Sequence, residues 1–419
     1  MRKKIVLGVF IVAVCSVFVY ASSRDAKQKK EELFKQVGLF SDTLSIVESD
    51  YVDEVNFKNL IYGALKGMLA SLDPHSQFLD PDTYNELKVD TEGKFGGLGI
   101  EITIKDGLLT VVTPIEDTPA WKAGMKAGDR IVKVENDLTR DMTLTEAVKK
   151  LRGKPGEAVK ITVLRESEKK ILEFKIVRDI IRIKDIKVAK ILENGIGYIR
   201  LVEFRENTAA DLDTVLKRLN KEGMKAVILD LRNNPGGLLD VAVDVTGKFI
   251  EKGKLVVYTQ GRRPSQNLKF LARSASPVLD TPMVVLINEG SASGSEIVAG
   301  ALQDYRRAIV VGIKSFGKGS VQTVIPLSDG SAIRLTTSKY YTPSGRVIHG
   351  KGVLPDIVIE EAKADTLPQS AEEIETVKPS DIFDQIEHGR PEKKPAEKDA
   401  EKTEETKDFD YKKDVQIVG

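Results

Sequence analysis

The sequence predicts an α/β core with a mostly parallel sheet, preceded by a β-rich domain and a helical N-terminal segment. Apolar, β-branched runs at 197–204, 226–231 and 283–288 predict the core, because helical patterns separate them and such strand–helix units form parallel sheets. Glycine-rich and polar turns follow the second and third runs, so we expect the functional site at the carboxyl ends of the strands. Strand-like runs between glycine turns predict the β-rich domain at 91–180.

Composition and charge exclude several classes of function. The 419 residues suffice for two or three domains, and their formal net charge is only +1, so nucleic acid is not expected as a partner. The single cysteine, Cys15, excludes an intramolecular disulfide. No group of histidine, cysteine or acidic residues has the spacing of a metal site, and we therefore expect neither a metal nor a cofactor.

Residues 1–25 have the pattern of an export signal. Arg2, Lys3 and Lys4 precede the apolar stretch Ile5–Ala21, which is long for a cleaved signal and short for a membrane-spanning helix. A signal peptide and a retained membrane anchor both remain open. In either case the basic flank stays inside and the rest of the chain is exported. We therefore expect the protein in the cell envelope, in the periplasm or on the extracytoplasmic side of the inner membrane.

The two ends of the remaining chain differ in character. Apolar residues such as Leu33 and Val37 recur at helical spacing and predict a helical region at 26–90. Beyond residue 360 the composition changes to charged and small residues, which predicts a tail at 361–419. Its part at 391–407 is close to low complexity and is expected to be disordered, because it has too little apolar surface to form a core.

A candidate nucleophile follows the apolar run Met283–Ile287. Polar residues break this run, and apolar positions at helical spacing then predict a helix at 292–304. Ser293 stands where that helix begins, and there free N–H groups and the helix dipole stabilise a developing oxyanion. A serine at this position is more often only a helix N-cap, and we keep that interpretation for Ser291 and Ser295.

A serine needs a group that removes its proton, and lysine is the better candidate here. The chain has three histidines, none of them in a triad motif: His75, His349 and His388. Lys318 lies in a stretch of apolar residues and glycines, where burial would lower its pKa and favour the neutral amine. Ser315 and Lys318 also match the S-x-x-K motif of penicillin-binding enzymes. We reject that alternative, because glycines flank the lysine and no S-D-N or K-T-G motif accompanies it.

Two stretches resemble the signature of a known family. GSASGSEIVAGALQD and FGKGSVQ are similar to the motifs of the C-terminal processing peptidases, which are serine–lysine proteases with a PDZ domain. The resemblance implies that Ser293 is the nucleophile, that Lys318 is the general base and that Gln322 orients the lysine. The family more often has alanine after the nucleophile. Here Gly294 follows it, and its N–H can still donate to an oxyanion.

The resemblance also implies a second oxyanion donor and a type of fold. An Asn-Pro-Gly-Gly turn follows the run 226–231, and the corresponding turn of the family supplies an N–H group. Gly236 and Gly237 are the candidates, and which of them donates stays open. Alone, this stretch would be an ordinary Asn-Pro-Gly turn, with nearby Asp230 and Arg232 as structural ion partners. The family comparison predicts a crotonase- and Clp-peptidase-like protease core at 181–360.

The β-rich domain at 91–180 resembles a PDZ domain. A glycine loop, Gly97-Leu98-Gly99-Ile100, is followed downstream by the pattern A-G-x-x-x-G-D-x-I at 123–131. Consecutive N–H groups of such a loop bind a terminal carboxylate, and a neighbouring strand edge pairs with the peptide. We therefore expect proteins or peptides with apolar C-termini as partners. Arg152 follows the helix expected at 143–151. Its ordinary role is that of a surface arginine near a helix C-terminus, and our sharper hypothesis is that it contacts the protease domain and reports PDZ occupancy.

Together these patterns predict an exported serine endopeptidase that recognises substrate tails through a PDZ domain and cleaves them with a Ser293–Lys318 dyad. The alternative is a catalytically silent PDZ scaffold. A third candidate, a crotonase-like acyl-CoA enzyme, explains the sheet but not the PDZ domain or the glycine-flanked lysine. A homo-oligomer and an activating adaptor both remain open as further partners.

Overall fold

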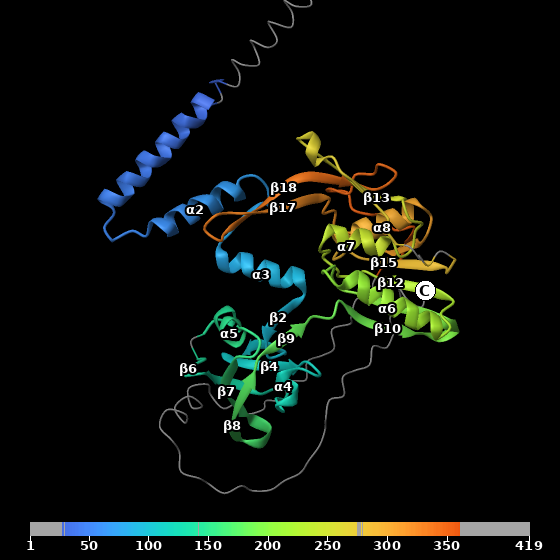
Figure 1. The fold of residues 1–419 in the computed structure, drawn as a ribbon, viewed down its shortest axis with the longest axis horizontal. Coiled ribbons are helices and arrows are strands. Elements are labelled where there is room, and N and C mark those ends of the chain that lie inside the picture. Colours follow the sequence, from blue (N-terminus) through green and yellow to red (C-terminus); the bar gives the residue numbers. More distant parts are fainter. Residues whose placement is uncertain (1–26, 29, 141, 275–277, 279, 361–419) are drawn as a thin grey trace, which may run out of the picture. The chain divides into compact units, whose positions relative to one another are not determined.

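The computed structural model describes residues 27–28, 30–140, 142–274, 278 and 280–360 (Figure 1). The predicted export signal at 1–25 and the predicted tail at 361–419 lie outside these residues. The chain divides between Phe78 and Leu79 into two compact units. Within the described ranges, no helix combines the length and the apolar character that crossing a membrane requires.

The first unit is helical, as its apolar spacing predicts. Residues 30–50 form one helix and α2 (Phe57–Ala70) a second. Asn56 caps α2, because its side-chain oxygen accepts the N–H of Asn59 at 3.1 Å. The ring of Tyr62 packs edge-on against Phe78, with 4.8 Å between their centroids. The short strand β1 (Gln77–Leu79) ends this part of the chain.

The second unit begins with α3 (Pro81–Glu92), whose ends follow from its sequence. Asp80 accepts the N–H of Thr83 at 3.0 Å and caps the start of the helix. Gly93 ends it with a φ of 67°, a left-handed conformation that favours glycine. An antiparallel ribbon of β2 (Lys94–Gly97) and β9 (Asp179–Arg182) then leads into and out of the β-rich domain.

The β-rich domain forms one antiparallel sheet with two helices. Its elements are β3 (Ile100–Lys105), β4 (Leu108–Pro114), α4 (Pro119–Lys122), β5 (Arg130–Val134), β6 (Asp137–Leu138), α5 (Leu144–Leu151), β7 (Ala158–Arg165) and β8 (Lys170–Val177). The strand order is β3-β4-β5-β7-β8, and β6 pairs with β5. A capping box starts α5, since Thr143 and Glu146 each accept the other's backbone N–H. A separate apolar core, which includes Ile131 and Ile161, fills this domain.

The protease-like core contains a six-stranded sheet that is mostly parallel, as predicted. Its strands, in spatial order, are β10 (Ile186–Ile191), β11 (Ile196–Leu201), β12 (Ala226–Asp230), β15 (Met283–Ile287), β16 (Ile309–Gly312) and β19 (Ile357–Val358). Only β10 is antiparallel to its neighbour. The central strands are apolar on both faces, because parallel sheets are covered on both sides. The expected strand 197–204 is shorter than predicted and ends at Leu201.

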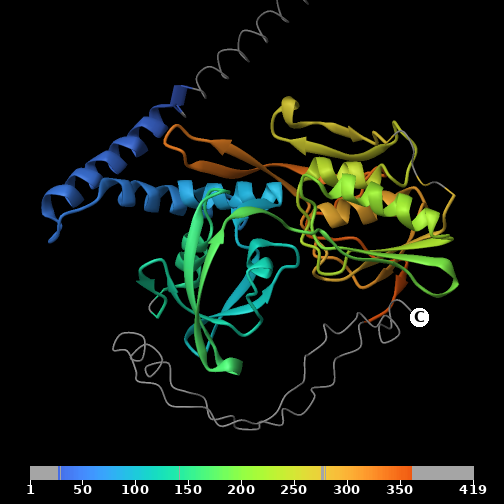
Figure 2. The ribbon, with the colours of Figure 1, turned by 60° about the horizontal axis from the view of Figure 1, so that its bottom comes forward.

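Three helices lie between this sheet and a second one (Figure 2). They are α6 (Thr208–Lys221), α7 (Leu239–Thr246) and α8 (Gly294–Asp304). The second sheet contains β13 (Leu255–Gly261), β14 (Lys269–Leu271), β17 (Ser320–Pro326) and β18 (Ala332–Tyr341). Strands β17 and β18 form a hairpin around Asp329 and Gly330. Short 3-10 turns occur at Glu166–Glu168, Glu193–Gly195 and Pro264–Gln266.

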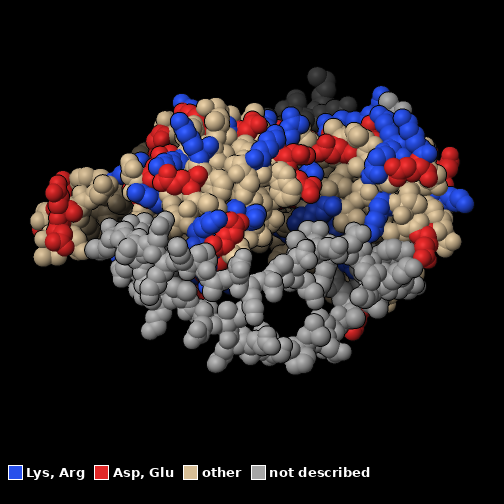
Figure 3. Space-filling model, turned by 90° about the horizontal axis from the view of Figure 1, so that it is seen from below, with Lys and Arg blue, Asp and Glu red and all other residues tan. Residues whose placement is uncertain are grey.

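Charged side chains of both signs are mixed on the face that Figure 3 shows. On the face shown in Figure 3, lysine and arginine side chains alternate with aspartate and glutamate side chains. This agrees with a net charge of +1 from 64 basic and 63 acidic residues. That face therefore presents no broad field of one sign that would steer a polyanion.

Candidate active site

Ser293 lies on a strained turn between β15 and α8. Its backbone has φ 53° and ψ −109°, outside the conformations that a residue with a side chain normally adopts. Two hydrogen bonds hold it there: its own N–H donates to Glu296 Oε2 at 2.8 Å, and the N–H of Ala292 donates to the carbonyl of Asn234 at 3.0 Å. In this conformation the serine lies at the start of α8, next to the free N–H groups of the first helical turn.

A pair of asparagines joins this nucleophile turn to the Asn-Pro-Gly-Gly turn after β12. Asn288 Oδ1 accepts the N–H of Asn233 at 2.8 Å, and Asn288 Nδ2 donates to Asn233 Oδ1 at 3.1 Å. The same Asn288 oxygen accepts the N–H of Gly290 at 3.1 Å. Because the Asn288 amide both accepts from and donates to Asn233, the two turns are fixed relative to each other.

Two serines add further bonds between the same turns. Ser291 Oγ donates to the carbonyl of Leu231 at 2.8 Å, and Ser295 Oγ donates to that of Asn234 at 2.9 Å. Both side chains are buried. The N-cap interpretation of Ser291 and Ser295 is therefore wrong, since Ser293 holds the N-cap position of α8 and the other two serines bind carbonyl groups 60 and 61 residues away.

Gly236 must be a glycine because of its closeness to the nucleophile. A Cβ at this position would lie 2.7 Å from Ser293 Cβ and 2.7 Å from the backbone nitrogen of Gly294. Its φ of 101° also disfavours any side chain. The N–H of Gly236 already donates to Asn234 Oδ1 at 2.9 Å. Gly236 thus supplies close backbone approach, while its own N–H is engaged elsewhere.

The N–H of Gly237 has a different environment. Phe204 forms a parallel bridge with Gly237, in which the Phe204 N–H donates to the Gly236 carbonyl at 2.9 Å and Phe204 accepts the N–H of Leu238 at 2.8 Å. In this pattern Phe204 binds the Gly236 carbonyl and the Leu238 N–H, and the Gly237 N–H points away from Phe204. Among the described residues, the N–H groups of Gly237 and Gly294 have no hydrogen-bond acceptor. These two groups are therefore available to an oxyanion.

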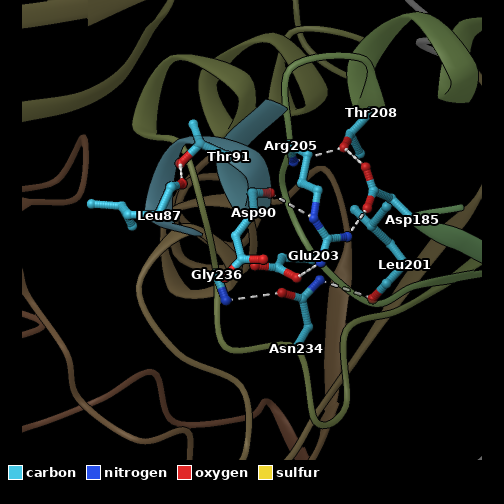
Figure 4. Close-up of polar contacts among 10 residues, drawn as sticks. All are labelled: Leu87, Asp90, Thr91, Asp185, Leu201, Glu203, Arg205, Thr208, Asn234 and Gly236. Atoms are coloured by element: carbon cyan, nitrogen blue, oxygen red, sulfur yellow. Dashed lines mark hydrogen bonds and ion pairs between the residues drawn. The ribbon is translucent and has the colours of Figure 1, made fainter. Parts of the chain in front are cut away.

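Phe204, which pairs with the turn that carries Gly237, is followed by Arg205, and Arg205 binds the end of α3 (Figure 4). Arg205 Nε donates to the carbonyl of Asp90, in the last turn of α3, at 2.9 Å. The Arg205 guanidinium also forms ion pairs with Asp185 and Glu203. A cation is favoured at the C-terminus of a helix, where carbonyl groups lack partners. Arg205 and its neighbour Phe204 therefore connect α3 with the turn that carries Gly237.

Glu296 joins the nucleophile turn to the lysine loop. Its carboxylate is fully buried in α8 and accepts four hydrogen bonds. Oε1 accepts the Gly317 N–H and the Ser315 hydroxyl, both at 2.6 Å, while Oε2 accepts the N–H groups of Ser293 and Lys318, both at 2.8 Å. Burial raises the pKa of Glu296, and the donated hydrogen bonds oppose that rise. The sequence reasoning missed this residue, although S-x-x-E is a known N-terminal helix pattern.

Lys318 has the environment that a neutral lysine requires. Burial lowers its pKa, the positive charge of Arg334 lowers it further, and only Glu296 raises it. In the described part of the chain, which includes both residues, no hydrogen bond joins the Lys318 amine to the Ser293 hydroxyl. Such catalytic contacts often tighten only when substrate binds.

Gln322 lies near the lysine but has other partners. Its Nε2 donates to Ser320 Oγ at 3.0 Å and to Thr336 Oγ1 at 3.2 Å. The residue lines the same cavity as Lys318. Its expected role in orienting the lysine stays a prediction.

One cavity of about 650 Å³ brings the predicted site residues together. Ser293, Lys318, Gln322, Gly236 and Gly237 all line it. Apolar and charged side chains line the rest; the apolar ones include Leu87, Leu238, Leu239, Ile297, Val321 and Val324, and the charged ones are Lys88, Asp90, Glu92, Glu203, Arg205, Glu206 and Arg334. A cavity of this size can hold several residues of an extended peptide beside the serine.

The glycine loop of the β-rich domain also has free N–H groups. The carbonyl of Leu98 accepts the N–H of Ala120 at 2.9 Å, and the carbonyl of Gly99 accepts that of Ile115 at 2.8 Å. Gly99 has a φ of 79°, and a Cβ there would lie 2.2 Å from Thr118. Within the described ranges, the N–H groups of Leu98 and Gly99 donate to no acceptor. They are therefore free to bind a carboxylate.

Arg152 lies at the C-terminal end of α5. Its guanidinium stacks over the ring of Phe95 in β2, with 4.3 Å to the ring centroid. Among the described residues it makes no ion pair or hydrogen bond with the protease-like core through its side chain. Its expected contact with that core stays a prediction.

Three regions of the chain match known sequence families. Residues 195–359 match Peptidase family S41, residues 110–165 match the PDZ domain, and residues 16–83 match the Activating protease CtpB N-terminal domain. The three matches follow one another along the chain in the order of the predicted helical region, β-rich domain and core.

Several proteins are similar to most of the chain. A carboxy-terminal-processing protease of Bartonella bacilliformis is 46% identical over 360 residues, which cover 85% of this chain and 82% of the relative. A CtpA-like serine protease of Staphylococcus epidermidis is 35% identical over 365 residues, covering 87% and 73%. Among solved structures, a photosystem II D1 C-terminal processing protease is 31% identical with a TM-score of 0.45, covering 77% of this chain and 86% of that one.

Proposed function

The chain belongs to peptidase family S41 and is a C-terminal processing serine protease with a PDZ domain, and on this premise we propose that Ser293 and Lys318 form its catalytic dyad. Its core has the ClpP- and crotonase-like fold of that family. This membership speaks against a catalytically silent scaffold and against an acyl-CoA enzyme. The observation that best supports the dyad is that the strained Ser293, the half-buried Lys318 and Gly237 line the same cavity.

The proposed reaction follows from these positions. Ser293 Oγ attacks the scissile carbonyl carbon while the neutral Lys318 amine takes its proton. The N–H groups of Gly237 and Gly294 donate to the oxyanion of the tetrahedral intermediate. The C–N bond then breaks, Lys318 gives the proton to the leaving amine, and an acyl-enzyme remains. Water then loses a proton to Lys318 and attacks the ester; the bond between the acyl carbon and Oγ breaks, and Lys318 returns the proton to Ser293 Oγ as the acid product leaves.

Substrate selection is proposed to begin in the PDZ domain. The loop Gly97-Leu98-Gly99-Ile100 has two N–H groups without acceptors among the described residues, which supports the binding of a C-terminal carboxylate. The apolar part of the mixed lining of the catalytic cavity, which includes Leu238 and Ile297, supports contact with apolar side chains of the substrate. The basic flank and apolar stretch at residues 2–21 support export to the cell envelope.

Cleavage of a tailed substrate tests this proposal. The full chain is incubated with an unstructured reporter protein that ends in an apolar tail, alongside the Ser293→Ala and Lys318→Met variants. We expect cleavage by the wild type and a loss of at least about 10³-fold in both variants. Cleavage that survives Lys318→Met would show that another group is the base. A reporter with an amidated C-terminus tests the PDZ domain, because the loop N–H groups then lack a carboxylate to bind.

A further inference from the structure

Tyr340 lies at the catalytic cavity. Neither the sequence motifs nor the proposed reaction assigns it a role. It belongs to β18, and its side chain is 1% exposed. It lines the cavity that Ser293 and Lys318 also line. A tyrosine in a strand is usually a core residue whose hydroxyl reaches any nearby acceptor. The partners of this hydroxyl are therefore what decides its role.

Tyr340 binds the backbone of the lysine loop at two points. Its N–H donates to the carbonyl of Gly319 at 3.0 Å, and its hydroxyl donates to the carbonyl of Lys318. On the other side, Glu296 accepts the N–H of Lys318 at 2.8 Å. The peptide groups on both sides of the Lys318 Cα are thus held, one by Glu296 and one by Tyr340. The position of the amine depends on both.

The Tyr340 hydroxyl reaches the lysine loop at the same cavity that Ser293 lines. Burial and the charge of Glu296 hold the pKa of Tyr340 well above its usual value, so the phenol stays neutral and is no general base. It can hold the lysine loop but cannot replace Lys318 as the base.

We propose that Tyr340 is a positioning residue of the Ser–Lys dyad, whose hydroxyl fixes the Lys318 main chain at the cavity that Ser293 lines. The inference rests on the proposed function of those two residues. In the first step, the proton of the Ser293 hydroxyl moves to the Lys318 amine as Oγ attacks. Tyr340 keeps its own proton throughout, and its bond to the Lys318 carbonyl keeps the amine in reach.

Phosphonylation of Ser293 by a fluorophosphonate measures activation of the nucleophile independently of the PDZ domain and of a protein substrate. The full-length Tyr340→Phe variant is compared with wild type from pH 6 to 10, with Ser293→Ala as the blank. We expect the maximal phosphonylation rate to fall about 10-fold, as for one lost hydrogen bond. We also expect the midpoint of the pH profile to move to higher pH, because a relaxed loop exposes Lys318. The charges of Arg334 and Glu296, which also act on Lys318, are unchanged in the variant.

Tyr341→Phe is the matched control. Tyr341 is the next residue of β18, stacks on Tyr258 with 5.1 Å between ring centroids, and is not part of the cavity lining. We expect Ser293 of this variant to be phosphonylated at the wild-type rate with an unchanged pH midpoint. A loss of rate in Tyr341→Phe equal to that in Tyr340→Phe would overturn the proposal, because the effect would then be one of strand stability.

A second variant keeps the test decisive if Tyr340→Phe folds poorly. 4-Aminophenylalanine at position 340 keeps a donor for the Lys318 carbonyl, and we expect it to restore at least half of the lost rate and the original pH midpoint. Wild-type phosphonylation kinetics in Tyr340→Phe, or no rescue by the 4-amino group, would refute the positioning role. If the wild type is not labelled at Ser293, the proposed function itself fails. Labelling that is insensitive to Tyr340 refutes only the present inference.

Discussion

Glu296→Gln is the substitution that most sharply tests how the nucleophile and the base are held together. The buried carboxylate accepts two hydrogen bonds on each oxygen. An amide keeps one oxygen and replaces the other with an NH₂ group, which cannot accept. The least costly orientation turns the NH₂ group toward Ser315 and Gly317, because the Ser315 hydroxyl can rotate and accept. The Gly317 N–H then remains buried without a partner.

The size of the effect follows from this count. One orphaned buried N–H costs about 1–3 kcal/mol, and the remaining bonds lose their charge assistance, which adds about 1 kcal/mol. We therefore expect the free energy of unfolding of the core to fall by about 2–4 kcal/mol. For a domain of this size the melting temperature should drop by about 5–10 °C.

The activity should change in a direction that lost stability alone does not predict. Glu296 is the group that raises the pKa of Lys318, so its neutralisation lowers that pKa further. Lysine acts as a base only above its pKa. The acid limb of the pH–rate profile for phosphonylation of Ser293 should therefore move to lower pH in Glu296→Gln. This shift is opposite to the one expected for Tyr340→Phe.

Differential scanning calorimetry measures the loss of stability, and phosphonylation by a fluorophosphonate from pH 6 to 10 measures the shift of the acid limb. Glu289→Gln is the control, since Glu289 lies in the same turn but is exposed. It should leave the melting temperature and the pH profile unchanged. A Glu296→Gln variant that melts like wild type, or whose acid limb moves to higher pH, would contradict the described role of the carboxylate.

Three further substitutions test other parts of the site. Gly236→Ala should lower kcat by at least about 10²-fold, because its Cβ would lie 2.7 Å from Ser293 Cβ, and steady-state cleavage of the tailed reporter measures this. Arg205→Met should lower the free energy of unfolding by about 3 kcal/mol in urea titrations, because Asp185 is 3% exposed and loses its ion partner; an unchanged midpoint would contradict this. Gly99→Ala should weaken tail-peptide binding about tenfold by fluorescence anisotropy, because its φ is 79°. Phosphonylation of Ser293 by a fluorophosphonate should stay at the wild-type rate in Gly99→Ala.

Much of the fold could be predicted because its signals are local. The β-branched run Met283–Ile287 and the helical spacing after it predict β15 and α8, and they put Ser293 at their junction. The hairpin at Asp329 and Gly330 follows from a two-run pattern around a turn dipeptide. In each case the apolar period alone decides which face is buried, so a single sequence is sufficient.

The polar contacts within the site could not be predicted in the same way. Glu296 binds groups 19–22 residues away on a loop that has no periodic pattern, and its own helical position would suit an exposed N-terminal glutamate equally well. Tyr340 has the period of a buried strand residue, which says nothing about its hydroxyl. Ser291 and Ser295 bind carbonyls of the other turn, and those partners become neighbours only after β12 and β15 pair.

The most direct test of the account is to find which residue a fluorophosphonate phosphonylates and what controls the rate. The full chain is treated with a fluorophosphonate and the adduct is mapped by mass spectrometry of the digested protein, at several pH values. We predict a single adduct on Ser293, a rate that rises with pH to a midpoint below the usual lysine value of 10.5, and no such rise in Lys318→Met. An adduct on another residue, or the same pH profile in Lys318→Met, would contradict the Ser293–Lys318 dyad.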